Sequence, residues 1–343
     1  MLITRALLSL FTLAVACWHG PVIAQEKPSW LVDPALLEAA KKEGALVVYS
    51  STNEQEALPL WQQFEDATGI KVSYVRGADS QLMSRMVIEH RTAKTSWDIV
   101  QTANVQQVPA EMVAAYEPPE ARNLIPEARA ADKRWYAVYA NYNTPAYNSK
   151  FVKPQELPNT YEEFLARPQW VGKMAIDIND ESWLATIYQH YGEARGAKLI
   201  DDIVAMHKPV VTNGHLAMAR AVAAGEYWIA LNNYLNLTVN VKLSGGPTDF
   251  WVLDPVSLYF GNAGIAALAP HPNAARLGAN FLISREAQAH LAKFGRLPTR
   301  GDVETNPPGV LDHVRKARVI TTVLDQADAK RWSKTFEQQF KRR

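Results

Sequence analysis

The hydrophobic and polar positions of the first hundred residues repeat one pattern. Residues 45–49 (ALVVY) form an almost uninterrupted apolar run, as expected of a parallel strand buried on both faces. A polar loop follows at 50–53, and the apolar residues after it recur at helical spacing as far as Gly69. Strand, loop and helix recur over 70–91, and 97–100 is a third apolar strand. This order predicts an α/β fold with doubly wound parallel sheets.

Two later stretches predict crossings between separate α/β regions. Residues 135–147 (WYAVYANYNTPAY) are aromatic and rich in amides and lack a helical period, and 251–258 is also expected to be extended. A second α/β region starts with the strand expected at 173–178, and a further strand is expected at 263–268. The tail, 310–340, is expected to be mainly helical.

The stretch GEYWIALNNYLN, residues 225–236, places amides and a phenol after an apolar run. We expect a buried strand that ends in a polar turn at Asn232, Asn233 and Tyr234. In open α/β sheets, ligands bind beyond the carboxyl ends of the strands. The sequence therefore predicts that this turn contributes to a binding site.

The N-terminus has the pattern of a secretory signal peptide. Arg5 precedes the apolar run 6–17, and Val22-Ile23-Ala24 is a small-residue cleavage pattern before Gln25. Removal of residues 1–24 is therefore expected. Cys17, the only cysteine, is an alternative lipid-attachment site. If it leaves with the signal peptide, the mature chain has no thiol for disulfides, catalysis or metal binding.

The charge balance argues against a nucleic-acid partner. The chain has 36 basic and 35 acidic residues, and residues 1–24 hold one arginine and no acid. The mature chain thus has 35 of each, whereas nucleic-acid binding needs a basic face. Residues 25–343 are enough for two ordinary α/β domains.

Known catalytic motifs do not appear in the sequence. We find no GxSxG, HExxH, Walker, GxGxxG or CxxC pattern, so a hydrolytic enzyme is a minor alternative, and no cofactor is expected. The seven histidines beyond the signal peptide are scattered and are expected to be surface or cap residues. The carboxylates Asp177, Asp180 and Glu181 could take a cation or an amine, or could simply be solvated in their loop.

Several segments together resemble the periplasmic solute-binding proteins of ABC importers. They are EGALVVYSSTNEQEALPLWQQFEDATGIKVSYVR (43–76), WDIV (97–100), LPNTYEEFLARPQWVGK (157–173), AAGEYWIAL (223–231) and APHPNAARLGANFLISREAQ (269–288). The chain is similar to extracellular solute-binding proteins of family 1 type, the group that includes ferric-ion, phosphonate and sugar-phosphate binders.

This resemblance implies the type II periplasmic-binding-protein fold, in which two lobes joined by two crossing hinge strands enclose a ligand cleft. It places lobe 1 at 25–138 plus 259–305, and lobe 2 at 139–258 plus 306–343. It also implies a periplasmic monomer that delivers its ligand to a permease in the inner membrane.

The resemblance also indicates that a bare iron site is incomplete here. Ferric-binding members carry a His, a Glu and two adjacent tyrosines, and hard Fe(III) favours such anionic oxygen donors. The matching positions here are Asn53, Ala103 and Tyr234-Leu235. Only Tyr234 is a ligand of the same type. A ferric ion or ferric chelate therefore remains an alternative ligand, with Tyr234 as its one matching metal ligand.

The expected ligand is a small organic anion, such as a phosphonate, phosphate ester or carboxylate. Ser50, Ser51, Thr52 and Asn53 stand between a strand and a helix N-terminus, where hydroxyls and free N–H groups bind anions, although Thr52 and Asn53 could be caps only. Arg76, in the equivalent next loop, could grip the anion bidentately or form a surface pair with Asp79 or Glu54.

Amide and aromatic side chains are expected to complete the binding site. They would fix the ligand's orientation and cover its apolar part. Trp183 has a competing interpretation as a core residue at the start of a helix. These further candidates are Asn104, Asn141, Asn143, Trp183, Asn232 and Tyr234, with Tyr259 and Asn262 as weaker ones.

Overall fold

The computed structural model describes residues 28–178 and 180–340. The expected signal peptide and Cys17 lie outside these residues. In the described part of the chain, no helix combines the length and apolar character needed to cross a membrane.

One continuous mixed sheet runs through the molecule. Its strands follow the order β2-β1-β3-β10-β5-β8-β6-β7, with β4 and β11 paired to β10 and β9 paired to β5. The outer pairs β1–β2, β1–β3 and β6–β7 are parallel, but β10 is antiparallel to β3 and β5. The strands are β1 (Ala45–Ser50), β2 (Lys71–Arg76), β3 (Ile99–Thr102), β4 (Val113–Ala114), β5 (Tyr136–Asn148), β6 (Met174–Asp177), β7 (Val210–Thr212), β8 (Ile229–Tyr234), β9 (Thr248–Phe250), β10 (Val256–Ala266) and β11 (Val319–Thr321).

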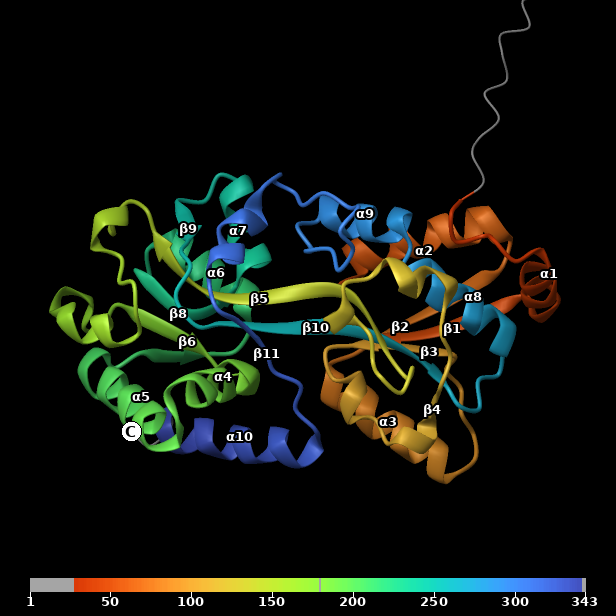
Figure 1. The fold of residues 1–343 in the computed structure, drawn as a ribbon, viewed down its shortest axis with the longest axis horizontal. Helices are drawn as coiled ribbons and strands as arrows, with labels where there is room; N and C mark the ends of the chain where they lie inside the picture. Colours follow the sequence, from red (N-terminus) through yellow and green to blue (C-terminus); the bar gives the residue numbers. More distant parts are fainter. Residues whose placement is uncertain (1–27, 179, 341–343) are drawn as a thin grey trace, which may run out of the picture.

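The helices gather around the two ends of this sheet (Figure 1). We call the elements around β1–β3 lobe 1 and those around β6–β8 lobe 2. Lobe 1 has α1 (Pro34–Glu43), α2 (Glu54–Thr68), α3 (Asp79–Arg91), α8 (Pro272–Leu282) and α9 (Arg285–Lys293). Lobe 2 has α4 (Glu181–Tyr191), α5 (Glu193–His207), α6 (His215–Ala224), α7 (Leu235–Leu243) and α10 (Gln326–Phe340). The residue boundaries of the lobes stated above stay a prediction.

Helix α2 shows how the sequence pattern sets the local structure. Leu60, Trp61 and Phe64 form the stripe that faces the core and are at most 2% exposed. The helix ends at Gly69, whose φ of 76° is the left-handed conformation that favours glycine, and its N–H donates to the Glu65 carbonyl at 2.7 Å. This packing fixes the N-terminus of α2 beside the carboxyl end of β1.

Two aromatic clusters stabilise the lobes. In lobe 1, the rings of Trp61, Phe64 and Phe281 lie within 5.7 Å of one another, centroid to centroid. In lobe 2, the ring of Phe164 packs against Trp170 at 5.9 Å and Trp251 at 6.1 Å. Such rings bury large apolar areas, which is the main favourable contribution to folding.

Strands β5 and β10 cross between the lobes side by side (Figure 1). The crossing predicted at 135–147 is therefore extended, as expected. The second crossing was predicted at 251–258, but 251–255 is not a strand. The crossing strand is β10, which begins at Val256 and continues into 263–268, the stretch that was predicted to be a separate strand. The tail is helical mainly from residue 326, since 310–316 forms two 3₁₀ turns and β11 follows them.

Candidate ligand-binding site

The loop after β1 presents polar groups at the N-terminus of α2. The Thr52 N–H donates to Ser50 Oγ at 3.0 Å, which turns the chain towards the helix. Asn53 is the N-cap residue, but its side chain makes no capping hydrogen bond. Thr52 Oγ1 is buried without a partner. Because the first turn of a helix has N–H groups with no intrahelical acceptor, this terminus can bind an anion.

Three lobe 1 loops meet beside this helix terminus. Arg76 Nη2 donates to Asn53 Oδ1 at 3.1 Å, and not to Asp79 or Glu54 as the alternative surface-pair interpretation supposed. Asn104 Nδ2 donates to Asp79 Oδ2 at 3.2 Å. Burial raises the pKa of Asp79, although hydrogen bonds from Ser51 and the Ala103 backbone act in the opposite direction. Asp79 thus joins the predicted residues, and sequence reasoning treated it only as a partner for Arg76.

The crossing strands contribute a polar face to the junction of the lobes. Asn141 and Asn143 are two residues apart on β5, so they share a face. Asn141 lies opposite Tyr259 of β10, and Asn143 lies opposite Tyr234 of β8. Four of the predicted residues, including the weaker candidate Tyr259, therefore meet on this face.

Tyr234 is the centre of a compact polar cluster. Its ring lies 5.1 Å from that of Tyr259 and 3.6 Å from the imidazole of His215, centroid to centroid. His215 Nε2 is 3.5 Å from Asp180 Oδ1 and 3.8 Å from Asp177 Oδ1. Both carboxylates are at most 2% exposed. We call these five residues the Tyr234 cluster.

Burial dominates the electrostatics of the Tyr234 cluster. Loss of solvent raises the pKa of both phenols well above the ordinary value, and nearby Asp180 raises them further. Burial also raises the pKa of Asp180. For His215, burial lowers the pKa, but Asp180 raises it and the net shift is upward. The cluster therefore favours neutral phenols and a protonated imidazole beside a carboxylate.

A largely buried guanidinium, that of Arg296, lies beside the first turn of α2. Arg296 donates to both carboxylate oxygens of Glu56, at 2.7 and 3.2 Å, and stands 4.4 Å from the centre of the Tyr139 ring. Glu56 in turn accepts from Asn53 Nδ2 at 3.3 Å. Glu56 and Arg296 thus form a charge-balanced pair at the α2 terminus.

Many polar atoms around this junction are buried and unpaired. An unpaired buried polar atom costs about 1–3 kcal/mol, so their concentration indicates a place that a polar ligand or water fills. Among the described residues they include Thr52 Oγ1, Gln101 Nε2, Asn141 Oδ1, Asn143 Oδ1, Thr144 Oγ1, Asn233 Oδ1, Asn262 Oδ1, His215 Nδ1 and both amide atoms of Asn236.

Two predicted site residues have structural roles instead. Trp183 is fully buried in the lobe 2 core, and its indole N–H donates to Tyr161 Oη at 3.0 Å. Asn232 uses both ends of its amide on the backbone of Asp177, accepting at 2.7 Å and donating at 3.0 Å. The Trp183 indole N–H is used within the core, and both amide atoms of Asn232 are engaged by the Asp177 backbone, so these two predictions do not fit the structure.

The prediction of a polar turn after residue 231 was also wrong. Asn232, Asn233 and Tyr234 belong to β8, because this strand pairs with β5 through Asn143↔Tyr234 and Thr144↔Asn233. The expectation of surface or cap histidines fails for His207 and His290, which are 0% and 8% exposed, and for His215, which is 7% exposed. A glycine and a histidine directly after a strand, in TNGH (212–215), were the available signal for its position.

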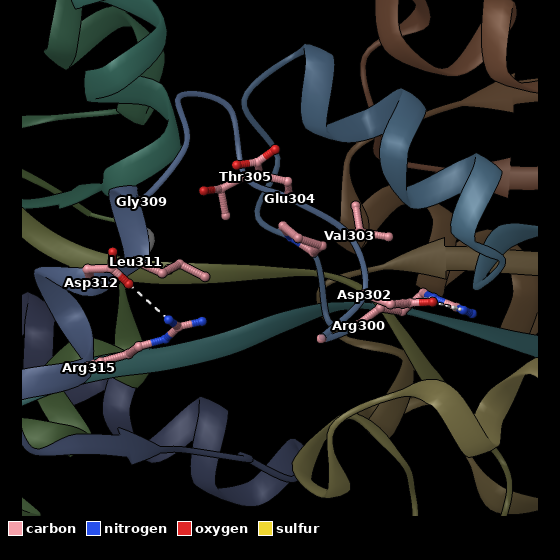
Figure 2. A pocket seen from close by; sticks show the side chains of 11 residues that line it. Arg300, Asp302, Val303, Glu304, Thr305, Gly309, Leu311, Asp312 and Arg315 are labelled. Carbon is pink, nitrogen blue, oxygen red and sulfur yellow. Dashed lines mark hydrogen bonds and ion pairs between the residues drawn. The ribbon is translucent and has the colours of Figure 1, made fainter.

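A surface pocket elsewhere is less suited to capture a charged ligand. Figure 2 shows a hollow of about 430 Å³ lined by the segment between α9 and β11. Its two arginines are already paired: Arg300 with Glu120 and Asp302, and Arg315 with Asp312. None of the residues of the Tyr234 cluster lines this hollow.

The positions that match the His, Glu and paired tyrosine ligands of ferric-binding proteins do not form such a ligand set in this structure. Leu235 is fully buried at the start of α7, and Ala103 contributes its backbone to Asp79. Within residues 28–178 and 180–340, no group of three or more His, Cys, Asp or Glu side chains is arranged to hold a metal ion.

The sequence profile of the bacterial extracellular solute-binding proteins matches residues 101–328. The chain belongs to this family. Members of the family are the binding components of ABC importers, which work with membrane permeases, and the relatives are solute-binding proteins rather than enzymes. The family expected from the sequence is therefore confirmed.

The relatives of this solute-binding protein include proteins named for iron uptake and proteins named for phosphonate binding. "Iron uptake protein A1" of Synechocystis is 26% identical over 76% of this chain and 77% of its own length. A "putative 2-aminoethylphosphonate-binding periplasmic protein" of Salmonella paratyphi A is 23% identical over 97% of this chain and 98% of its own length.

Solved structures confirm the type II two-lobed fold of this solute-binding protein. Iron-bound HitA from Pseudomonas aeruginosa superposes with a TM-score of 0.72 at 20% identity, covering 86% of this chain and 98% of that one. AfuA from Actinobacillus pleuropneumoniae, with fructose-6-phosphate bound, gives 0.73 at 18% identity, covering 88% and 99%. At such identities the likeness shows the fold alone.

Proposed function

We propose that this protein is the periplasmic component that captures a small organic anion between its lobes and delivers it to an ABC permease. The observation that carries this proposal is the set of buried, unpaired polar atoms on the paired strands β5, β8 and β10 and at the α2 terminus. A phosphonate, phosphate ester or carboxylate is the ligand class. The capture is non-catalytic, and the protein acts as a monomer.

The α2 terminus supports an anion on the lobe 1 side. Helix N-termini favour negative charge through their free N–H groups and the helix dipole. The Thr52 hydroxyl is available as a further donor, and Arg76 lies at the rim. Arg76 donates to a neutral amide and forms no ion pair within the described ranges, so its charge is available to the ligand.

Closure of the two lobes is the capture mechanism that we propose. Hinge closure around a ligand is the established mode of two-lobed binding proteins. β5 and β10 continue from one lobe to the other and are the elements that would bend. The rings of Tyr234 and Tyr259 are partly exposed, so they can contact a ligand that enters between the lobes.

A thermal-shift screen of residues 25–343 tests this function. The panel contains 2-aminoethylphosphonate, sugar phosphates, di- and tricarboxylates, aromatic acids and ferric citrate. A ligand that binds only the folded state raises the melting temperature by mass action. We expect an organic anion to raise it while ferric ion does not. Failure of every organic anion to shift the melting temperature would contradict the proposal.

The Thr52→Val variant then tests the anion site itself. Valine keeps the shape of threonine but removes the unpaired hydroxyl, so folding is little affected while affinity for the anion falls by about tenfold. Thr335→Val, which changes an exposed hydroxyl on α10, is the matched control and keeps full affinity. Equal affinity of the two variants for the anion would show that the Thr52 hydroxyl does not bind it.

Ferric iron or a ferric chelate is the second candidate, favoured by the meeting of two phenols. Tyr234 and Tyr259 are adjacent, with His215 and Asp180 close by, and these are donor types that Fe(III) accepts. This candidate predicts a visible tyrosinate–iron colour with ferric citrate. Tyr234→Phe would abolish the colour, and a colour that survives this change would exclude Tyr234 as the ligand.

A further inference from the structure

A second cavity, of about 640 Å³, lies between lobe 2 and the segment that joins α9 to β11. That segment runs from lobe 1 to lobe 2 (Figure 1). The lining comes mainly from α7, from β9 and the two residues after it, and from 307–316. Among the described residues that line the cavity, none belongs to the Tyr234 cluster or the α2 terminus. The cavity is therefore separate from the proposed anion site.

The lining is mainly apolar because the cavity lies where the hydrophobic cores of the two lobes meet. Phe250 and Val252 pack against the core of lobe 1 and the crossing strands, whereas Trp251 between them belongs to the lobe 2 core. Tyr147, also of the lobe 2 core, packs against Trp251 with 5.9 Å between ring centroids. Small-molecule sites typically enclose about 300–1,000 Å³ between such hydrophobic and aromatic walls. The cavity thus has the size and lining of a ligand site.

Helix α7 continues the apolar lining to the mouth of the cavity. Leu243 is the last residue of α7 and is 56% exposed. Val239 precedes it by four residues, so both side chains lie on the same face of the helix, and both line the cavity. A single exposed leucine is ordinary on a protein surface. Here it joins an apolar strip along which the body of a ligand can enter.

The polar groups of the cavity have an excess of positive charge. Lys242 Nζ pairs with Asp249 Oδ2 at 2.7 Å, so these two charges balance. Lys316 also lines the cavity, and it has no ion-pair partner in the described part of the chain. The imidazole of His313 lies edge-on to Phe250, with 6.0 Å between ring centroids. An ammonium and an imidazole beside apolar walls complement a carboxylate attached to an apolar body.

We propose that this cavity is a second ligand site, which binds a small amphipathic carboxylate. The apolar body lies among Val239, Phe250 and Trp251, and the carboxylate pairs with Lys316. This site is independent of the anion captured between the lobes. Because the lining comes both from lobe 2 and from the segment that arrives from lobe 1, a bound acid contacts both and holds that segment against α7.

Three compounds test the two requirements by calorimetric titration of the unaltered protein. 4-Phenylbutyrate has both the ring and the charge, 4-phenylbutanamide lacks the charge, and butyrate lacks the ring. We expect 4-phenylbutyrate to bind at least about threefold more tightly than the amide, as for a partly exposed ion pair. It should bind at least about tenfold more tightly than butyrate, because the buried ring leaves water.

The Leu243→Asp variant shows where the acid binds. It replaces apolar surface at the mouth by a negative charge, so the affinity for 4-phenylbutyrate should fall about tenfold, while the exposed position leaves folding intact. Leu268→Asp changes a leucine that is 61% exposed and does not line the cavity, so it is the matched control and keeps full affinity. Thr52→Val, which alters the proposed anion site, should also keep it.

The Lys316→Gln variant tests the recognition of the carboxylate. It should bring the affinity for 4-phenylbutyrate to within about twofold of that for 4-phenylbutanamide, because the charge that attracts the acid is gone. Lys334→Gln, which changes an exposed lysine of α10 outside the cavity, is the control and keeps the difference between acid and amide.

The outcomes separate this inference from the proposed function. Equal binding of acid and amide to the unaltered protein, or no binding of 4-phenylbutyrate, would overturn the second site. An affinity for 4-phenylbutyrate that falls in Thr52→Val and not in Leu243→Asp would also overturn it, and would assign the acid to the anion site instead. The anion function is judged by its own ligands, so it stands or fails independently of this cavity.

Discussion

Arg296 donates hydrogen bonds to both carboxylate oxygens of Glu56, in an ion pair whose side chains are 11% and 12% exposed. Glu56 belongs to the first turn of α2, and Arg296 follows α9, so 240 positions of sequence separate the two partners. The pair fixes the chain after α9 against the helix terminus that we propose as the anion site.

Arg296→Ala should lower the free energy of unfolding by about 3–5 kcal/mol, because it leaves Glu56 buried without its partner. Urea denaturation measures this effect. Arg195→Ala removes an exposed pair with Glu162 and should change the free energy by less than about 1 kcal/mol. The double variant Arg296→Met with Glu56→Leu removes both charges. If it lowers the free energy of unfolding as much as Arg296→Ala alone, the unpaired carboxylate is not the cause of the loss.

Trp183→Phe should destabilise the protein without weakening ligand binding. The substitution removes the hydrogen bond to Tyr161 and leaves a void in the lobe 2 core, at a cost of about 1–3 kcal/mol. Denaturation and ligand titration of the same variant separate the two effects. A large loss of affinity with unchanged stability would restore Trp183 to the binding site.

Gly261→Ala should disturb the crossing strands, because an added Cβ would lie 2.2 Å from the Tyr139 ring. We expect a loss of about 1–3 kcal/mol, as for other overpacking substitutions. Gly301→Ala is the control, since nothing lies within 4 Å of its added Cβ. In a double-mutant cycle, Tyr139→Leu should recover part of the loss; strict additivity would show that the two side chains do not clash.

His215 should make the protein less stable as the pH rises. Its folded-state pKa is raised in spite of burial, because Asp180 favours the imidazolium. The contribution of His215 to the free energy of unfolding is therefore fully present below the unfolded-state pKa of about 6.5, and it is lost as the pH rises through the higher folded-state pKa. The free energy of unfolding, measured from pH 5 to 9, should exceed that of His215→Gln by more at the acid end.

The difference between the two curves isolates His215 from other histidines. Burial lowers the pKa of His207 and His290, so their contributions have the opposite pH dependence in both proteins and cancel in the difference. A difference that stays constant, or that grows towards alkaline pH, would show that His215 is not held as the cation.

The proximity of the lobe 1 candidate residues could be predicted because it depends on local sequence. Ser50, Thr52 and Asn53 stand between an apolar run and a helical stripe, and Arg76 holds the same place one strand later. Carboxyl ends of parallel strands meet at one sheet edge, so the loops had to come together. The hydrogen bond between Arg76 and Asn53 is the result.

The Tyr234 cluster could not be predicted from pattern because it depends on pairing between distant strands. Tyr234 and Asn143 become neighbours only through the antiparallel register of β8 on β5. A one-residue shift of register would turn these side chains to the other face, and hydrophobic pattern does not fix the register of polar strands. The prediction for Asn232 fails for a related reason: its amide satisfies the Asp177 backbone, so a polar residue is stable inside a buried strand.

The last helix has a consequence for how the chain acquires its structure. Trp332, Phe336 and Phe340 of α10 belong to the lobe 2 core, where the Trp332 ring packs 5.0 Å from that of Tyr188. A nascent chain therefore cannot complete lobe 2 until residue 340 has been synthesised, although its strands β6 to β8 are made much earlier. Contacts of such long sequence separation form slowly, so an incomplete chain stays open to chaperones for most of its synthesis.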